Sequence, residues 1–358
     1  MGKPQRWLIS PEELNGWLDS LADSRVLIAP READGVVLYR RVAKSNEIVH
    51  GARPVLSVKE FFFPPTERLF TIEKTGQEVH LAEALPEAPA IIFGVRPCEA
   101  RGARLLDALF LDTNPTDAYY ARRRENTTLI GLACAELGPT CFCTSVGGAP
   151  DAADDVDIML YENGASYLVE SVTEKGRFLI PGGEWKKTAA KPKPSIDKPR
   201  SPSLRSGDAS QSTIPSASLR GRFAVVNPHN IPWPERFGDA YWQRISERCL
   251  SCRACAYVCP TCRCFAVRDE MLGPGEFERV RCWDSCAGEN YRRVAGGHRP
   301  RPEKGERLRN RIYCKFFYLP EQVGLDGTSA CTGCGRCIDV CPVGVDITEV
   351  LQDLGRPA

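Results

Sequence analysis

Long apolar runs are scarce in this sequence, and the longest of them, such as residues 90–95, fall far short of a bilayer span. Residues 1–8 lack the apolar core of a secretory signal. The formal net charge is only +1, so no overall field attracts nucleic acid or an acidic membrane. We therefore expect a cytoplasmic protein with no membrane span and no nucleic-acid partner.

Motifs for common cofactors and for catalysis are also missing. No G-x-G-x-x-G follows an expected strand, and there is neither a phosphate-binding loop nor a C-x-x-C-H haem attachment motif. The histidines are few and scattered, and none has a base or a metal spacing beside it: His50, His80, His229 and His298. We expect no catalytic site in this chain.

Cysteine, by contrast, is abundant, with seventeen residues. Cytosolic thiols stay reduced, and a chain of 358 residues does not need a disulfide framework. So many free thiols without a role would be an oxidation hazard. Ligation of metals or clusters is the remaining explanation, and the spacing of the cysteines decides which kind.

Two stretches match the bacterial ferredoxin run C-x2-C-x2-C-x3-C-P. In that run, three thiolates bind one 4Fe–4S cluster, and the fourth binds the other cluster because the longer gap turns it away. The first predicted cluster therefore takes Cys249, Cys252, Cys255 and Cys341. The second predicted cluster takes Cys331, Cys334, Cys337 and Cys259. Structural zinc is the rival interpretation, but zinc sites use paired C-x-x-C motifs rather than this spacing.

Four further cysteines, Cys98, Cys134, Cys141 and Cys143, lie in the N-terminal half. Cys98 and Cys134 each follow an expected strand, so both can sit at one edge of a sheet. The four could hold a third cluster. A zinc site or a group of buried thiols is the alternative, because C-x-C is not ferredoxin spacing.

The remaining cysteines carry weaker signals. Cys262 and Cys264 follow the first motif directly, and Cys286 lies in Trp283-Asp-Ser-Cys286. These three are candidates for tuning a cluster, for ligating a further centre, or for plain packing. Cys282 and Cys314 have no partner pattern.

Composition divides the chain into three parts. Residues 1–181 alternate short apolar strands, at 25–29, 35–39, 90–95 and 128–133, with helices at 11–22 and 101–110, which predicts an α/β (α+β) domain. Residues 182–222 are rich in Lys, Pro and Ser, which predicts a disordered linker or an inserted loop. Residues 223–358 carry both motifs. Because residues 261–330 separate the motifs, we expect an α-helical ferredoxin domain with two 4Fe–4S clusters.

Local signals add three elements and a basic segment. Asn163-Gly164 predicts a hairpin turn, residues 234–248 a helix, and residues 346–354 a closing helix capped by Asp346. Between the motifs, residues 292–315 are rich in Arg and Lys. Such positive charge can stabilise a reduced cluster or dock an acidic partner, and a solvated surface is the alternative.

Several motifs together resemble a known family. They are the run from Phe61 to Phe70, Arg96-Pro-Cys-Glu99, Cys141-Phe-Cys143, Cys259-Pro-Thr-Cys-Arg-Cys264, Trp283-Asp-Ser-Cys286 and Gly296-Gly-His298. The chain looks like the 4Fe–4S dicluster proteins that include the beta subunit of sulfhydrogenases and the A component of anaerobic sulfite reductase. The linker departs from that pattern.

The resemblance implies an iron–sulfur electron-transfer subunit of a multi-subunit oxidoreductase of anaerobic metabolism. Its partners would be a flavoprotein subunit that handles NAD(P)H and a catalytic subunit of hydrogenase, sulfite reductase or heterodisulfide reductase type. Two other hypotheses remain. One is a zinc-binding, non-redox assembly or regulatory protein, and the other is a self-sufficient reductase with an unrecognised flavin site.

Overall fold

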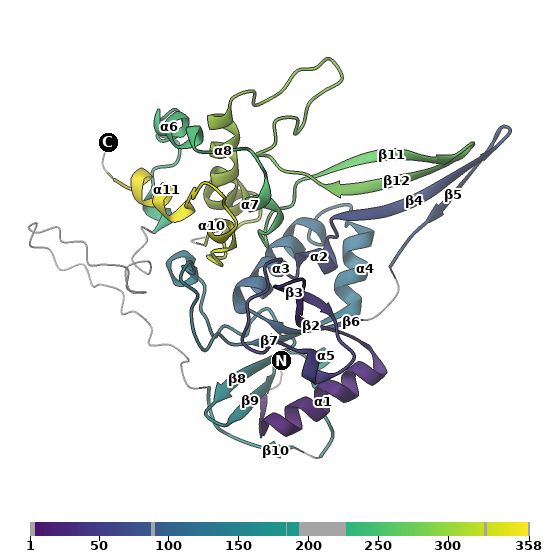
Figure 1. The fold of residues 1–358 in the computed structure, drawn as a ribbon, viewed down its shortest axis with the longest axis vertical. Coiled ribbons are helices and arrows are strands. Elements are labelled where there is room, and N and C mark those ends of the chain that lie inside the picture. Colours follow the sequence, from purple (N-terminus) through teal and green to yellow (C-terminus); the bar gives the residue numbers. More distant parts are fainter. Residues whose placement is uncertain (1–3, 87–89, 184, 193–226, 326–327, 357–358) are drawn as a thin grey trace, which may run out of the picture.

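The computed structural model describes residues 4–86, 90–183, 185–192, 227–325 and 328–356. These residues form an N-terminal α/β body, a projecting four-stranded arm and a helical C-terminal region (Figure 1). The mixed α/β character predicted for the N-terminal part is confirmed. The helical C-terminal region packs against the side of the body that carries α3 (Pro97–Phe110).

The body is built on one eight-stranded sheet in the order β10-β1-β9-β8-β7-β6-β2-β3. Strands β2, β6, β7 and β8 form its parallel pairs, and the remaining pairs are antiparallel. The bounds are β1 (Gln5–Ile9), β2 (Val26–Ala33), β3 (Val36–Arg41), β6 (Ala90–Val95), β7 (Thr127–Leu132), β8 (Ile158–Asn163), β9 (Ser166–Ser171) and β10 (Lys186–Lys187). Every residue of β7 is buried, as expected for a central strand covered on both faces.

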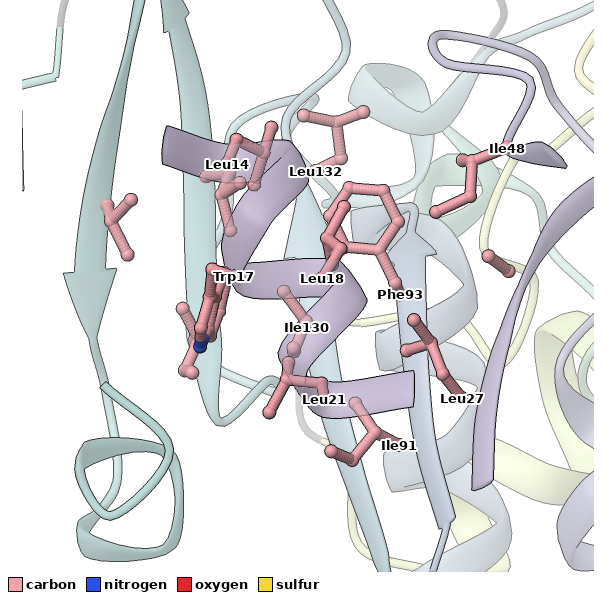
Figure 2. Close-up of a cluster of buried hydrophobic side chains, with 14 of the residues drawn as sticks. Leu14, Trp17, Leu18, Leu21, Leu27, Ile48, Ile91, Phe93, Ile130 and Leu132 are labelled. Carbon is pink, nitrogen blue, oxygen red and sulfur yellow. The ribbon is translucent and has the colours of Figure 1, made fainter. Parts of the chain in front are cut away.

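Helix α1 (Pro11–Ser24) covers one face of this sheet (Figure 2). Ser10 and Glu13 form a reciprocal capping box at its start, and Pro11 occupies the first turn, where its missing N–H costs nothing. Its buried stripe includes Leu14 and Leu18, which meet the inward side chains of β6 and β7. Helix α3 and helix α4 (Ala118–Asn126) lie against the opposite face through a second apolar cluster. This packing fixes the positions of the C-terminal ends of β6 and β7. The N-terminal cysteines lie in the segments that follow these two ends.

The arm is a second sheet, in the order β11-β12-β4-β5. Its strands are β4 (Thr66–Thr75), β5 (Glu78–Glu83), β11 (Phe265–Gly273) and β12 (Glu276–Trp283). One hairpin comes from each half of the chain, and both extend away from the body (Figure 1). The segment between the ferredoxin motifs therefore contains a β-hairpin, so the C-terminal half is not purely helical.

The C-terminal helices are short and surround an aromatic core in which Trp233 stacks on Phe316. They are α6 (Tyr241–Glu247), α7 (Ala254–Tyr257), α8 (Lys304–Tyr313), the π-helical turn η5 (Cys314–Tyr318), α9 (Leu319–Gln322), α10 (Arg336–Asp339) and α11 (Ile347–Leu354). The predicted cap of the last helix is confirmed, because the Asp346 carboxylate accepts a hydrogen bond from Thr348 N. Short helical turns elsewhere are η1 (Ser45–Glu47), α2 (Lys59–Phe62), η2 (Cys143–Val146), α5 (Glu174–Arg177) and η4 (Pro228–Asn230).

The predicted linker overlaps the described sheet at its beginning. Trp185 is buried beside Trp17, and Lys186–Lys187 pair with β1 as strand β10. The sheet thus takes in residues that composition alone assigns to the linker. Most of the predicted linker, residues 193–222, lies outside the described residues.

Candidate metal centres

The first pocket collects cysteines from both ferredoxin motifs. It is lined by Cys249, Cys252 and Cys255 from the first motif and by Cys341 from the second. Cys337 also lines this pocket. Backbone amides point at two of the sulfurs: Ser251 N lies 3.4 Å from Cys249 Sγ, and Val345 N lies 3.2 Å from Cys341 Sγ. Such donors stabilise sulfur that carries negative charge.

The loop around the first pocket takes an uncommon backbone conformation. Ser251 and Arg253 have φ angles of 54° and 69°, although neither is glycine. Left-handed residues are sparsely populated outside glycine, so two of them so close together mark a tightly wound loop. The three sulfurs of this C-x2-C-x2-C loop all line the first pocket.

In the second pocket, the second motif supplies three cysteines and the first motif supplies one. It is lined by Cys331, Cys334 and Cys337 from the second motif and by Cys259 from the first. Gly333 N lies 3.4 Å from Cys331 Sγ. Apart from Cys337, which lines both pockets, each pocket has the set of motif cysteines that the spacing predicts for one cluster. Ligation of clusters by these eight residues stays a prediction.

Two buried cations lie between and beside these pockets. Arg311 lines both pockets and is 5% exposed, while Lys315 lines the second pocket and is 2% exposed. Within the described part of the chain, neither side chain forms an ion pair with a carboxylate. Arg311 reaches Cys255 O at 3.4 Å, and Lys315 Nζ donates to Thr261 Oγ1 at 2.7 Å.

Burial and the surrounding thiols have opposite effects on the pKa values of Arg311 and Lys315. Burial lowers the pKa of Arg311 and Lys315, but the neighbouring cysteines, Cys255 and Cys259 foremost, outweigh it and raise both. Burial also raises the pKa of the Cys331 thiol to about 12. Buried cations require compensating negative charge, and cysteine-ligated clusters are anionic. The two pockets therefore fit iron–sulfur clusters in both donor set and charge.

All four N-terminal cysteines line one cavity of about 310 Å³. Cys98 lies in the first turn of α3, Cys134 follows β7, Cys143 begins η2, and Cys141 lies just before η2. Because β6 and β7 are parallel neighbours, the segments that follow them leave the same edge of the sheet. Burial raises the pKa of the Cys143 thiol to about 12. We call this space the N-terminal cavity.

The N-terminal cavity is in direct contact with the second ferredoxin motif. Cys334 lines both the cavity and the second pocket. Phe142 N donates to Gly333 O at 2.8 Å, and a Cβ added to Gly333 would lie 2.5 Å from Cys143 N. Glycine is required there both for this close approach and for its φ of +65°.

A buried ion pair joins the same two regions. The guanidinium of Arg336 lies 2.7 Å from Glu99, and both side chains are almost completely buried. Tyr39 donates a hydrogen bond to the same carboxylate at 2.5 Å, and Arg336 Nε donates to Pro54 O at 3.0 Å. Glu99 follows Cys98, and Arg336 precedes Cys337. This network therefore sets the position of one site relative to the other.

Four of the five remaining cysteines divide into two groups, while Cys282 lies on β12. Cys262 stays beside the second pocket, where its carbonyl accepts from Lys59 Nζ at 3.2 Å; burial lowers the pKa of Lys59 to about 8. Cys264 and Cys286 instead face a separate cavity together with Cys314. Sequence reasoning missed Cys314, because it belongs to no cysteine motif.

The basic segment between the motifs is not uniform. Sequence reasoning treats its arginines and lysines alike, as a tuning charge, a docking face or a solvated surface. The structure separates Arg311 and Lys315, which are buried at the pockets, from Arg309, which is only partly buried, lies over Phe237 and lines neither pocket. Arg311 and Lys315 are separated by about one helical turn. This spacing could have indicated from the sequence that the two side chains lie on the same face of a helix.

Comparison with known proteins assigns the class of this chain. The 4Fe-4S dicluster domain family matches residues 248–345, which include both ferredoxin motifs. This is an iron–sulfur protein. None of the described helices is long and apolar enough to cross a membrane.

A relative extends the assignment to most of the chain. Sulfhydrogenase 2 subunit beta of Pyrococcus furiosus is 32% identical over 302 residues, which is 84% of each chain. The present chain belongs to the family of that protein, so the resemblance drawn from its motifs is confirmed. No solved structure matches it.

Proposed function

We propose that this chain is an electron-transfer subunit that relays electrons between a flavoprotein subunit handling NAD(P)H and a catalytic subunit of a cytoplasmic oxidoreductase. The catalytic subunit would be of hydrogenase, sulfite reductase or heterodisulfide reductase type. The name of the related sulfhydrogenase subunit, which describes part of a multi-subunit enzyme, supports such an assembly.

One observation carries this proposal: three cysteine-lined spaces adjoin one another within a single fold. Arg311 and Cys337 line both ferredoxin pockets, and Cys334 lines the second pocket and the N-terminal cavity. Bound 4Fe–4S clusters supply one-electron redox chemistry to such a site. The cysteines hold them, the buried walls exclude water, and Arg311 and Lys315 compensate their negative charge.

The proposed ligand sets follow the lining of the three spaces. The first cluster would be held by Cys249, Cys252, Cys255 and Cys341, and the second by Cys331, Cys334, Cys337 and Cys259. A third cluster in the N-terminal cavity would be held by Cys98, Cys134, Cys141 and Cys143. The order in which the three spaces adjoin suggests an electron path from the N-terminal cavity through the second pocket to the first pocket.

The experiment that tests this function is anaerobic purification followed by metal, sulfide and spectroscopic analysis. We expect a brown protein with iron and acid-labile sulfide, whose broad visible absorbance bleaches with dithionite. A colourless protein that contains zinc would instead support the non-redox assembly or regulatory role. Flavin released from the isolated chain would support a self-sufficient reductase, and its absence would reject that hypothesis.

A further inference from the structure

A cavity of about 660 Å³ beside the cluster region contains three cysteines that the proposed clusters do not use. Cys264, Cys286 and Cys314 line it, and they come from the loop after the first motif, the loop after β12, and η5. Arginines line the same cavity: Arg263, Arg292 and Arg301. Among the residues that the structure describes, no Asp or Glu lines this cavity. We call it the thiol cavity.

The root of the β11–β12 hairpin brings two of these thiols together. Phe265 pairs with Trp283 at the end of the ladder, and Asp284 N donates to Cys264 O at 2.8 Å. This closed hairpin base sets Cys264 opposite the turn that carries Cys286. Cys264 and Cys286 are close enough for each thiol to shift the pKa of the other. Cys264 is half-buried, whereas Cys286 is 6% exposed.

The pair is chemically asymmetric. The hydrogen bond from Cys286, assisted by one from Tyr291, lowers the pKa of Cys264 to about 5 against the opposing effect of burial. The same hydrogen bond, together with burial, raises the pKa of Cys286. An accessible thiolate beside a protonated, buried thiol is the arrangement of an attacking and a resolving cysteine.

We propose that Cys264 and Cys286 form a redox-active dithiol that reduces a small anionic disulfide bound in the thiol cavity. The Cys264 thiolate attacks one sulfur of the disulfide, forms a mixed disulfide and releases the first thiolate. Cys286 then loses its proton and attacks Cys264 Sγ, which releases the second thiolate. The products are a Cys264–Cys286 disulfide, one small thiol that carries the proton from Cys286, and one small thiolate.

The arginines indicate the charge of the ligand. Arg263 Nη1 lies 3.4 Å from Cys314 Sγ, and its other nitrogen donates to Gln322 at 2.9 Å. The Arg292 guanidinium lies 5.8 Å from the Tyr291 ring centre. Among the described residues, none of the three cavity arginines forms an ion pair with a carboxylate. A cationic wall without acidic residues favours an anionic ligand.

Return of the pair to the dithiol requires two electrons and two protons. The proposed electron-transfer function would supply these electrons, and only this regeneration rests on that function. The exchange reaction itself needs nothing beyond the reduced pair and the disulfide. The two proposals can therefore fail separately.

The test uses the full-length chain, purified anaerobically, reduced with dithionite and desalted. Glutathione disulfide, an anionic disulfide, is then added, and differential alkylation with peptide mass spectrometry locates the disulfides formed. We expect a Cys264–Cys286 disulfide and release of glutathione. Cys264→Ser should abolish both, whereas Cys282→Ser, which changes a cysteine on β12 outside the cavity, should leave both unchanged.

Two results would overturn the proposal. One is the absence of the Cys264–Cys286 disulfide in the unsubstituted protein after exposure to glutathione disulfide. The other is loss of iron or zinc in Cys264→Ser and Cys286→Ser relative to Cys282→Ser, because these thiols would then be ligands of a further metal centre. Iron content of the unsubstituted protein reports separately on the proposed function, since the disulfide can form whether or not clusters are present.

Discussion

The two ferredoxin pockets and the N-terminal cavity present the same donor atoms but are assembled in different ways. Each ferredoxin pocket takes three sulfurs from one short, tightly wound loop and a fourth from the other motif. The N-terminal cavity gathers its four sulfurs from the start of α3, the segment after β7 and the start of η2. Local spacing is enough to form most of the first kind of site. The second kind exists only because β6 and β7 are neighbours in a sheet.

Removal of a ferredoxin-motif sulfur should have the largest effect. We expect Cys331→Ala to lose one cluster and to stop electron transfer through the complex, because that sulfur lines the second pocket but not the first. Iron, acid-labile sulfide and NAD(P)H-driven turnover of the reconstituted complex measure the change. Cys282→Ala is the matched control. Full transfer with both clusters intact in Cys331→Ala would show that the ligand assignment is wrong.

Removal of a sulfur from the N-terminal cavity should have a more limited effect. In Cys134→Ala we expect loss of the iron of one cluster, while the spectroscopic signals of the two ferredoxin-motif clusters remain. Cys134 lies in a loop after β7, so its removal leaves the sheet intact. Electron paramagnetic resonance of the reduced protein tests this expectation. Iron content equal to that of Cys282→Ala would remove the case for a third cluster.

The ion pair between the two regions offers a third test. Glu99→Gln leaves the Arg336 guanidinium buried without its counter-charge, which costs about 3 kcal/mol. We expect a lower denaturant midpoint for loss of cluster absorbance under anaerobic conditions. The double variant Glu99→Gln/Arg336→Met should recover part of that loss. A midpoint unchanged in Glu99→Gln would show that the pair does not hold the two regions together.

A substitution at Gly335 tests the packing of the second ferredoxin motif against the N-terminal region, and we expect it to cost less stability than loss of the ion pair. In Gly335→Ala the new Cβ would lie 2.5 Å from the backbone oxygen of Thr140, and φ is +76°. Overpacking and a left-handed residue together cost about 2 to 3 kcal/mol. Gly344→Ala is a matched control, because its φ is +64° but nothing lies within 4 Å. If both variants lose the same stability, backbone strain alone accounts for the effect.

The smallest expected effect is on reduction potential. Arg311→Gln removes a buried positive charge that lines both ferredoxin pockets, so both reduced clusters lose stabilisation. We expect both potentials to fall by tens of millivolts, while that of the N-terminal cluster changes least. Redox titration followed by electron paramagnetic resonance measures this. Arg309→Gln, in the same helix but outside both pockets, should leave the potentials unchanged.

Several elements were predictable because their signals are local. Helix α1 has its capping residues and apolar stripe in one continuous segment, and the Asn163–Gly164 turn joins β8 to β9 as expected. The helix predicted at 234–248 is shorter: α6 begins at Tyr241, where the preceding Asp239 carboxylate accepts from Tyr241 N at 2.8 Å and favours a start there. The arm was not predicted, since β4 pairs with β12 from the other half of the chain, a neighbour that its own sequence does not specify.

Sequence alone determined the identity of the thiol ligands proposed for the two ferredoxin motifs, because a repeated spacing of two and three residues constrains where short loops can direct their sulfurs. It also determined the class and the family through those motifs. Tertiary structure decided which sites adjoin. Only folding places Cys334 between two cavities, buries Arg311 against both pockets, and brings Cys314 into one cavity with Cys264 and Cys286. These relations depend on contacts between residues far apart in the chain, which residue spacing does not encode.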